Sequence, residues 1–159
     1  MFLASALIGP EGGHAAGRQL LEKRYREHVG EPMPEICVGS KGKPYFKDAP
    51  WYFSISHTPR HAFCVLSQKE VGLDAEELDR DIKLALAEKI LSETERKEYE
   101  QAEDKRLALL TFWVLKEAHA KFTGEGIRGY PNKITVSLKD PRVKIIDGCL
   151  VAIIEDKEN

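Results

Sequence analysis

The sequence contains little cysteine. Only Cys37, Cys64 and Cys149 occur among 159 residues, and no two of them form a CxxC pair. An odd number of widely spaced cysteines predicts neither a disulfide framework nor a zinc site. Such cysteine usage favours a reducing compartment, and we expect the protein to be cytoplasmic.

The sequence also lacks an excess of charge of one sign and any long hydrophobic run. The formal net charge is −2 and the isoelectric point is about 6.2. This balance argues against extended electrostatic binding to nucleic acid or to an anionic membrane. The opening MFLASALIGPEGG has no basic leader, and no segment approaches the roughly 20 apolar residues that span a bilayer. We therefore expect a protein that is neither secreted nor membrane-bound.

Three short motifs look like known sites but lack their context. GEGIRG, at 124–129, spells GxGxxG, yet it follows a predicted helix, whereas a dinucleotide fingerprint follows a strand. GSKGKP lacks both the spacing and the final Ser or Thr of a P-loop. Ser56 and His57 are neighbours on a predicted strand, so they point to opposite faces and do not form a hydrolase triad.

Apolar periodicity predicts helices at 14–30 and 105–122, with two more between 77 and 104. Asp104 is a candidate N-cap, Gly124 lies beyond a helix end, and Ser92 with Glu95 forms a candidate capping box. The predicted strands are 36–38, 52–56, 61–67, 70–76, 133–138 and a hairpin at 143–154, which turns at Asp147-Gly148.

The order strand, helix, strands occurs twice, before and after about residue 70. This order predicts an α+β fold of two pseudo-symmetric halves, each a small antiparallel sheet packed with a helix. We expect an N-terminal half at 1–70 and a C-terminal half at 71–159, which together form one compact unit.

The helix at 105–122 carries two charges near its apolar face. On a helical wheel Lys121 falls inside the arc that holds Val114 and Ala118, and Glu117 lies at its edge. The alternative to a functional role is a solvated i,i+4 ion pair between Glu117 and Lys121, which is worth about 0.2–0.5 kcal/mol.

The strand at 70–76 presents two carboxylates. Asp74 and Glu76 are two residues apart, so both project to one face of a strand that we expect to be half-buried. Mg²⁺ prefers oxygen ligands and is usually held by one or two carboxylates together with substrate phosphate. The alternative is a polar strand end that faces water.

Two further segments carry candidate anion-binding groups. In GKPYF, Lys43 lies between a flexible glycine and Pro44, which fixes the backbone of a cation that could face phosphate. In FSISH, Ser56 and His57 close a strand. A structural role, as a solvated loop charge or a satisfied group at a strand end, is the alternative for each.

Taken in order, GKPYF, SISHT, GLDAE and WVLKEAHAK resemble the motifs of the 4′-phosphopantetheinyl transferase superfamily, particularly its surfactin-type branch. The resemblance covers roughly 18–138, and WVLKEAHAK is its most specific motif. It implies Mg²⁺-dependent transfer of the phosphopantetheine arm of coenzyme A to a serine of an apo acyl or peptidyl carrier protein, with release of 3′,5′-ADP. An activity of this kind would be described as a holo-[acyl-carrier-protein] synthase type.

The resemblance also implies roles for individual residues. It makes the C-terminal half the source of metal and catalytic groups, and the N-terminal half a contributor to coenzyme A binding. Lys121 would contact the phosphates, and Glu117 would be a metal ligand. Because the acceptor serine must lose a proton beside the metal, we also expect Glu117 to act as the base, directly or through water, which makes Glu117 and Lys121 the candidate catalytic residues. The implied metal ligands are Asp74, Glu76 and Glu117, and the implied coenzyme A contacts are Arg18, Lys43, Pro44, Ser56, His57 and Lys121.

Two alternatives remain within this reading. Only 41 residues precede GKPYF, so a segment that carries further coenzyme A contacts in longer relatives looks shortened. A non-catalytic relative that binds coenzyme A or a carrier is therefore one alternative, and a Mg²⁺-dependent phosphohydrolase is the other. Because two internal halves can supply each other's interface, we expect a monomer.

Overall fold

The computed structural model describes residues 1–126 and 131–156. Its strands are β1 (Phe2–Leu7), β2 (Ile36–Val38), β3 (Pro44–Phe46), β4 (Tyr52–His57), β5 (His61–Ser67), β6 (Val71–Glu77), β7 (Val143–Ile146) and β8 (Cys149–Glu155). Its helices are α1 (Gly13–Val29), α2 (Ala87–Ile90), α3 (Glu93–Gln101) and α4 (Lys105–Thr123), with short 3₁₀ turns η1 (Leu84–Leu86) and η2 (Pro131–Lys133).

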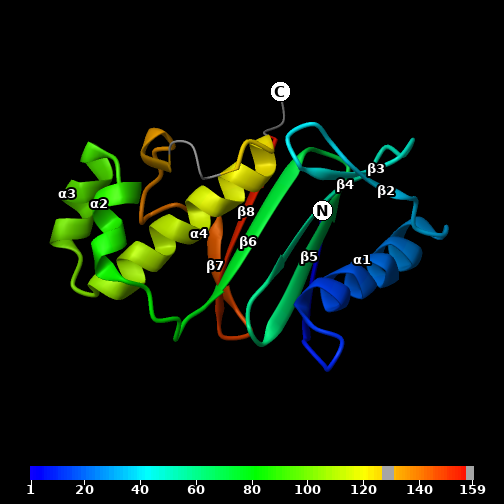
Figure 1. The fold of residues 1–159 in the computed structure, drawn as a ribbon, viewed down its shortest axis with the longest axis horizontal. Coiled ribbons are helices and arrows are strands. Elements are labelled where there is room, and N and C mark those ends of the chain that lie inside the picture. Colours follow the sequence, from blue (N-terminus) through cyan, green and yellow to red (C-terminus); the bar gives the residue numbers. More distant parts are fainter. Residues whose placement is uncertain (127–130, 157–159) are drawn as a thin grey trace.

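Two antiparallel three-stranded sheets form the centre of the fold. The first has the order β1-β5-β4 and the second the order β6-β8-β7, while β2 and β3 form a separate hairpin-like pair. Helix α1 lies on the outer side of the first sheet and α4 on the outer side of the second, so the strands lie between the two long helices (Figure 1). This arrangement confirms the predicted α+β class and its two similar halves. The boundary between 1–70 and 71–159 stays a prediction.

Three apolar clusters hold these layers together. One lies under α1 and includes Leu21 and Phe53, and another lies between α4 and the second sheet and includes Phe112 and Ile154. The third joins the two sheets and is formed by Phe63, Val65, Val71, Leu73, Ala75, Cys149 and Val151. Because the third cluster draws on both sheets, burial of apolar surface favours their joining.

Several local signals in the sequence are confirmed. Ser92 and Glu95 form a reciprocal capping box at the start of α3, and Asp104 caps α4. Gly124 ends α4 in the left-handed conformation. Asp147 and Gly148 both have positive φ, as a type I′ turn requires. The rest of the GEGIRG segment, from residue 127, lies outside the described residues.

The predicted strand at 133–138 is wrong. This segment begins in η2 and continues without regular structure. The backbone N–H of Val136 donates to Glu95 Oε1 at 2.7 Å, and that of Leu138 donates to Glu98 Oε2 at 3.0 Å. Because side chains of α3 satisfy these backbone groups, the segment needs no strand partner. Among the described helices, none combines the length and the apolar character that a membrane crossing requires.

The expectation that β6 is half-buried is also wrong, because α4 covers the face that carries Gly72 and Asp74. Six of its seven residues are buried. A Cβ atom built on Gly72 would lie 2.3 Å from Ala118 O and 2.3 Å from Phe122 N, both backbone atoms of α4. Glycine at position 72 therefore sets the close approach of α4 to β6, and with it the distance between the groups that these elements carry.

Replacing Gly72 by alanine is expected to destabilise the protein by about 1–3 kcal/mol, because the added methyl group forces backbone to move. Chemical denaturation measures this change. Gly30→Ala is a control for a glycine-to-alanine change without a close contact, because a Cβ atom at Gly30 would meet nothing within 4 Å. Its positive φ of 79° adds a backbone strain that Gly72→Ala does not have. A Gly72→Ala variant as stable as the native protein would contradict the close packing of α4 on β6.

Candidate active site

The site lies where β4 runs beside β6, between the two sheets. Two serine side chains of β4 bridge the strands: Ser54 Oγ accepts from the Leu73 N–H at 3.0 Å, and Ser56 Oγ accepts from the Ala75 N–H at 3.2 Å. Both serines are buried. Their hydroxyls satisfy backbone donors of β6 that would otherwise be buried without a partner. The position of Asp74 therefore depends on β4 as well as on its own strand.

Asp74 is the buried centre of the site. Its Oδ1 accepts from Ser56 Oγ at 3.1 Å and from Lys121 Nζ at 2.7 Å. Burial raises the pKa of Asp74, and the charge of Lys121 opposes this rise. Among the described residues, its second oxygen, Oδ2, is buried without a hydrogen-bond partner. An unsatisfied carboxylate oxygen is costly, so this oxygen is a ready acceptor for a cation.

Glu76 follows two residues later on β6 and faces the same side of the strand. Its Oε1 accepts from Trp113 Nε1 at 3.1 Å and from Arg80, which also stacks over the Trp113 ring at 5.7 Å. Burial and the neighbouring charge of Asp74 raise the pKa of Glu76, while Arg80 opposes the rise. Asp74 and Glu76, two residues apart, therefore project from the same face of β6.

Helix α4 brings the third carboxylate and the amine. Burial raises the pKa of Glu117 to about 7, and the charge of Asp74 adds to this rise. Lys121 Nζ reaches across to Asp74 and lies 3.5 Å from the Ile55 carbonyl oxygen. In the part of the chain that the structure describes, Lys121 therefore pairs with β6 rather than with Glu117. The alternative, a solvated ion pair between Glu117 and Lys121, is therefore not the contact that Lys121 makes.

A cavity of about 260 Å³ opens beside these groups. Its lining contains Glu117 and Lys121 from α4, Lys43 and Pro44 from the GKPYF segment, and Ser54 and Ile55 from β4. Segments that are far apart in the sequence thus meet at one depression. The GKPYF segment reaches this position because β3 pairs with β2, a pairing that the sequence reading did not predict.

Lys43 is held in place from two sides. Its Nζ donates to the Phe122 carbonyl oxygen at 2.6 Å and pairs with Glu70. Phe122 belongs to α4, so this contact connects the GKPYF segment to the helix that carries Glu117. Glu70 partly neutralises Lys43, and an anion in the cavity would compete with Glu70 for the ammonium group.

The remaining predicted residues are placed differently. Ser56 is buried between Asp74 and Ala75. His57 is exposed and lies with Glu76 at a second cavity of about 570 Å³. Arg18 is exposed on α1 and lines neither of these two cavities, within the residues that the structure describes. Roles for Arg18, Ser56 and His57 in binding coenzyme A stay predictions.

Sequence reasoning missed four groups that shape the site. Ser54 could have been found, because it is two residues before Ser56 and the period of a strand places both on one face. Trp113 is the first residue of the WVLKEAHAK motif, but the sequence alone does not show that its side chain contacts Glu76. Glu70 and Arg80 gave no signal, because isolated charges beside a strand are common in any soluble protein.

The oxygen donors of this site are of the type that a magnesium ion binds, but among the described residues the three carboxylates do not form a group with all ligand atoms within 4.8 Å of one another. Asp74, Glu76 and Glu117 offer hard oxygen atoms, which Mg²⁺ prefers. The unpartnered Oδ2 of Asp74 gives an independent structural reason to expect a cation here. Buried Asp74 therefore differs from the carboxylates of a solvated acidic surface, which form hydrogen bonds with water.

Comparison with known proteins decides the family. The family model described as the 4′-phosphopantetheinyl transferase superfamily matches residues 70–152, which contain β6, α4 and all three carboxylates of the site. This chain belongs to the 4′-phosphopantetheinyl transferase superfamily.

Individual relatives of the superfamily agree with this assignment. The chain is 30% identical over 129 residues to the 4′-phosphopantetheinyl transferase psf-1 of Bacillus pumilus, covering 78% of this chain and 55% of the relative. It is 36% identical over 114 residues to the 4′-phosphopantetheinyl transferase AcpT of Salmonella typhimurium, covering 69% of this chain and 57% of the relative. A third relative, the 4′-phosphopantetheinyl transferase of Bacillus subtilis, is 28% identical over 106 residues, covering 65% and 47%. The chain thus spans about half the length of these transferases.

Proposed function

We propose that this protein transfers the 4′-phosphopantetheine group of coenzyme A to a serine hydroxyl of an apo acyl or peptidyl carrier protein and releases 3′,5′-ADP. The observation that carries the proposal is the contact of Lys121 on α4 with Asp74 on β6 at 2.7 Å, beside a 260 Å³ cavity that Lys121 and Glu117 line. Membership of the transferase superfamily supports the same reaction. Among the activities of this superfamily, we propose the holo-[acyl-carrier-protein] synthase type.

Displacement at phosphorus concentrates negative charge on the pyrophosphate and on the departing nucleotide, so fixed cations contribute more than covalent catalysis does. Lys121 and Lys43 bring two ammonium groups to the cavity. We propose that Lys121 leaves Asp74 to contact the phosphates, and that Lys43 exchanges Glu70 for coenzyme A. A Mg²⁺ ion held by Asp74, Glu76 and Glu117 would add positive charge beside the pyrophosphate.

The acceptor serine must lose a proton as it attacks. Glu117 lines the cavity, so its carboxylate can reach a hydroxyl group that enters there. We propose that Glu117 accepts this proton, directly or through one water molecule. Asp74 and Glu76, which are held by Ser56 and by Arg80 with Trp113, keep the carboxylate geometry fixed.

We also propose the division of labour between the halves. Residues 1–70 would contribute coenzyme A contacts, including Arg18, Pro44, Ser56 and His57, and residues 71–159 would provide the metal ligands and the base. Because the two sheets bury a common apolar cluster, one chain can complete the site, and we propose a monomer. The free thiols of Cys37, Cys64 and Cys149 fit a reducing compartment, so we place the protein in the cytoplasm.

The proposal is tested by intact-mass spectrometry. The purified protein is incubated with Mg²⁺, coenzyme A and each member of a panel of apo acyl and peptidyl carriers. We expect at least one carrier to gain the mass of a single phosphopantetheine. A carrier whose acceptor serine is replaced by alanine is the matched control and should remain unmodified.

Two outcomes would overturn the proposal. Coenzyme A binding without modification of any carrier would identify a non-catalytic relative. Release of phosphopantetheine in the absence of a carrier, at a rate that carriers do not increase, would identify a Mg²⁺-dependent phosphohydrolase. In the first case the protein would bind coenzyme A without transferring the group, and in the second the acceptor would be water.

A further inference from the structure

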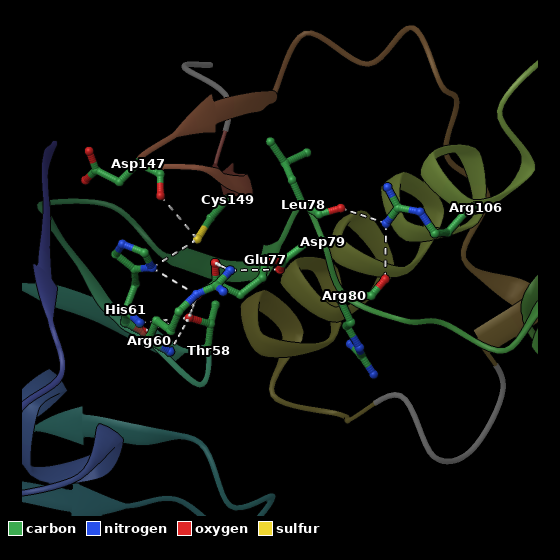
Figure 2. A network of polar contacts seen from close by, with 10 residues as sticks. All are labelled: Thr58, Arg60, His61, Glu77, Leu78, Asp79, Arg80, Arg106, Asp147 and Cys149. Atoms are coloured by element: carbon green, nitrogen blue, oxygen red, sulfur yellow. Dashed lines mark hydrogen bonds and ion pairs between the residues drawn. The ribbon is translucent and has the colours of Figure 1, made fainter.

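A second group of potential metal ligands lies away from the carboxylate site. His61 on β5, Glu77 on β6 and Cys149 on β8 each direct one ligand atom to a common point, and these atoms all lie within 4.8 Å of one another. Figure 2 shows the three side chains converging from three strands. His61 Nδ1 lies 2.9 Å from Glu77 Oε1 and 3.6 Å from Cys149 Sγ.

This cluster is separate from the proposed magnesium site. Glu77 follows Glu76 on β6, and successive residues of a strand point to opposite faces. Glu76 faces Trp113 of α4, whereas Glu77 faces His61 of β5. The three potential ligands therefore lie at the join of the two sheets and not beneath α4.

The cluster is not arranged as a nucleophilic triad. In a triad the histidine contacts the nucleophile through one ring nitrogen and the orienting carboxylate through the other. Here Cys149 and Glu77 both contact Nδ1 of His61. Cys149 is fully buried, and burial together with the charge of Glu77 raises the pKa of its thiol to about 12. A buried, protonated thiol does not attack substrates. As a zinc ligand the same thiol would release its proton when the ion binds, so zinc affinity would rise with pH.

The ligand types and their spacing instead suit zinc. We propose that His61 Nδ1, Glu77 Oε1 and Cys149 Sγ form a zinc-binding site with three protein ligands. Zinc binds nitrogen, sulfur and oxygen together, at about 2.0–2.1 Å, 2.3 Å and 2.0–2.2 Å respectively. A tetrahedral angle at the ion then places the nitrogen and sulfur atoms about 3.6 Å apart, close to the separation in this structure. The nitrogen and oxygen atoms would separate to about 3.4 Å, a shift of half an ångström or so.

Neighbouring side chains hold Glu77 in the required orientation. Thr58 Oγ1 donates to Glu77 Oε1, and Arg60 donates to the other oxygen, Oε2, at 2.8 Å. Such outer contacts fix ligating carboxylates in metal sites. Arg60 also pairs with Asp79, which balances part of its charge. A cavity of about 570 Å³ borders Thr58, Arg60 and Glu77.

Zinc at this position would connect the first sheet, through His61, to the second sheet, through Glu77 and Cys149. An ion that binds only the folded state stabilises it. The inference does not depend on the proposed transfer reaction, because the cluster shares no ligand with the magnesium site.

Cobalt substitution tests the site directly. The full chain is titrated with Co²⁺ in excess Mg²⁺, which occupies the hard carboxylate site, and the near-ultraviolet absorption of a cobalt–thiolate bond is recorded. We expect one equivalent of Co²⁺ to give this band and one equivalent of Zn²⁺ to displace it. Thermal unfolding should shift to higher temperature with Zn²⁺.

Variants assign the ligands. Cys149→Ser and His61→Ala are each expected to abolish the thiolate band or to weaken zinc binding by more than about 100-fold. Cys64→Ser is the matched control, because Cys64 is equally buried but faces the α1 cluster, and it should retain the band. Glu117→Gln should also retain it. Circular dichroism establishes that each variant is folded. A native protein without the band, or a folded Cys149→Ser variant that keeps it, would overturn the proposal.

Discussion

Replacing Glu117 by glutamine is expected to lower the rate of phosphopantetheine transfer by at least about 100-fold, the lower end of what a general base contributes. The amide keeps the size of the side chain but can neither accept a proton nor offer a charged oxygen to a metal ion. Transfer to a carrier that the native protein modifies, followed by mass spectrometry, measures the rate. Because Glu117 is only half-buried and its pKa is already raised, the neutral side chain should not destabilise the fold.

The same residue makes Mg²⁺ binding dependent on pH. Its pKa of about 7 means that Glu117 is largely protonated at pH 6 and largely ionised at pH 8 in the metal-free protein. A carboxyl group must be ionised to bind Mg²⁺, so Mg²⁺ affinity should fall as the pH decreases through 7, and it should fall less in Glu117→Gln. Calorimetric titration of Mg²⁺ at both pH values measures this difference.

A matched control separates this effect from a general change of charge. Glu100 is exposed on α3, and Glu100→Gln should leave both the transfer rate and the pH dependence unchanged. If Glu117→Gln transferred phosphopantetheine at a rate near that of the native protein, Glu117 would be neither the base nor an essential ligand.

The elements that carry the site could be predicted because their signals are local. Asp104 and Gly124 mark the ends of α4, and within it the helical period places Lys121 on the apolar side. The period of two on β6 places Asp74 and Glu76 on one face. These patterns depend on neighbouring residues only, so a single sequence contains them in full.

The contacts between elements could not be predicted in the same way. Nothing near Lys121 in the sequence shows that its partner is Asp74, 47 residues away. The bridges from Ser54 and Ser56 to β6 and the convergence of His61 with Cys149 likewise arise only after the sheets join. Apolar alternation at 133–138 predicts a strand, but a segment with alternately buried side chains shows the same alternation without being a strand. Here the backbone N–H groups bind side chains of α3 instead of a neighbouring strand.

A buried ion pair anchors α4 immediately beside the site. Lys116 and Glu95 are both fully buried, and Lys116 Nζ lies 2.8 Å from Glu95 Oε2. Lys116 also donates to the carbonyl oxygens of Pro131 and Ile134, at 2.7 and 2.5 Å. The pair therefore connects α3, α4 and the segment that contains η2.

Replacing Lys116 by methionine is expected to destabilise the protein by about 3–5 kcal/mol, which is the usual cost of leaving one member of a buried pair uncompensated. Methionine fills a similar volume, so the loss reflects charge and hydrogen bonds more than packing. Urea denaturation followed by circular dichroism measures the change. Lys83→Met, at an exposed position, is the control and should change stability by less than about 0.5 kcal/mol.

A second substitution shows whether the isolated charge causes the loss. Glu95 also accepts from the backbone N–H groups of Ser92 and Val136, both at 2.7 Å, and a glutamine at position 95 retains one acceptor oxygen for them. The double variant Glu95→Gln/Lys116→Met should therefore be more stable than Lys116→Met alone, because no unpaired charge is then buried. If the double variant were less stable than the single one, the backbone contacts of Glu95, and not its charge, would account for the stability that this pair provides.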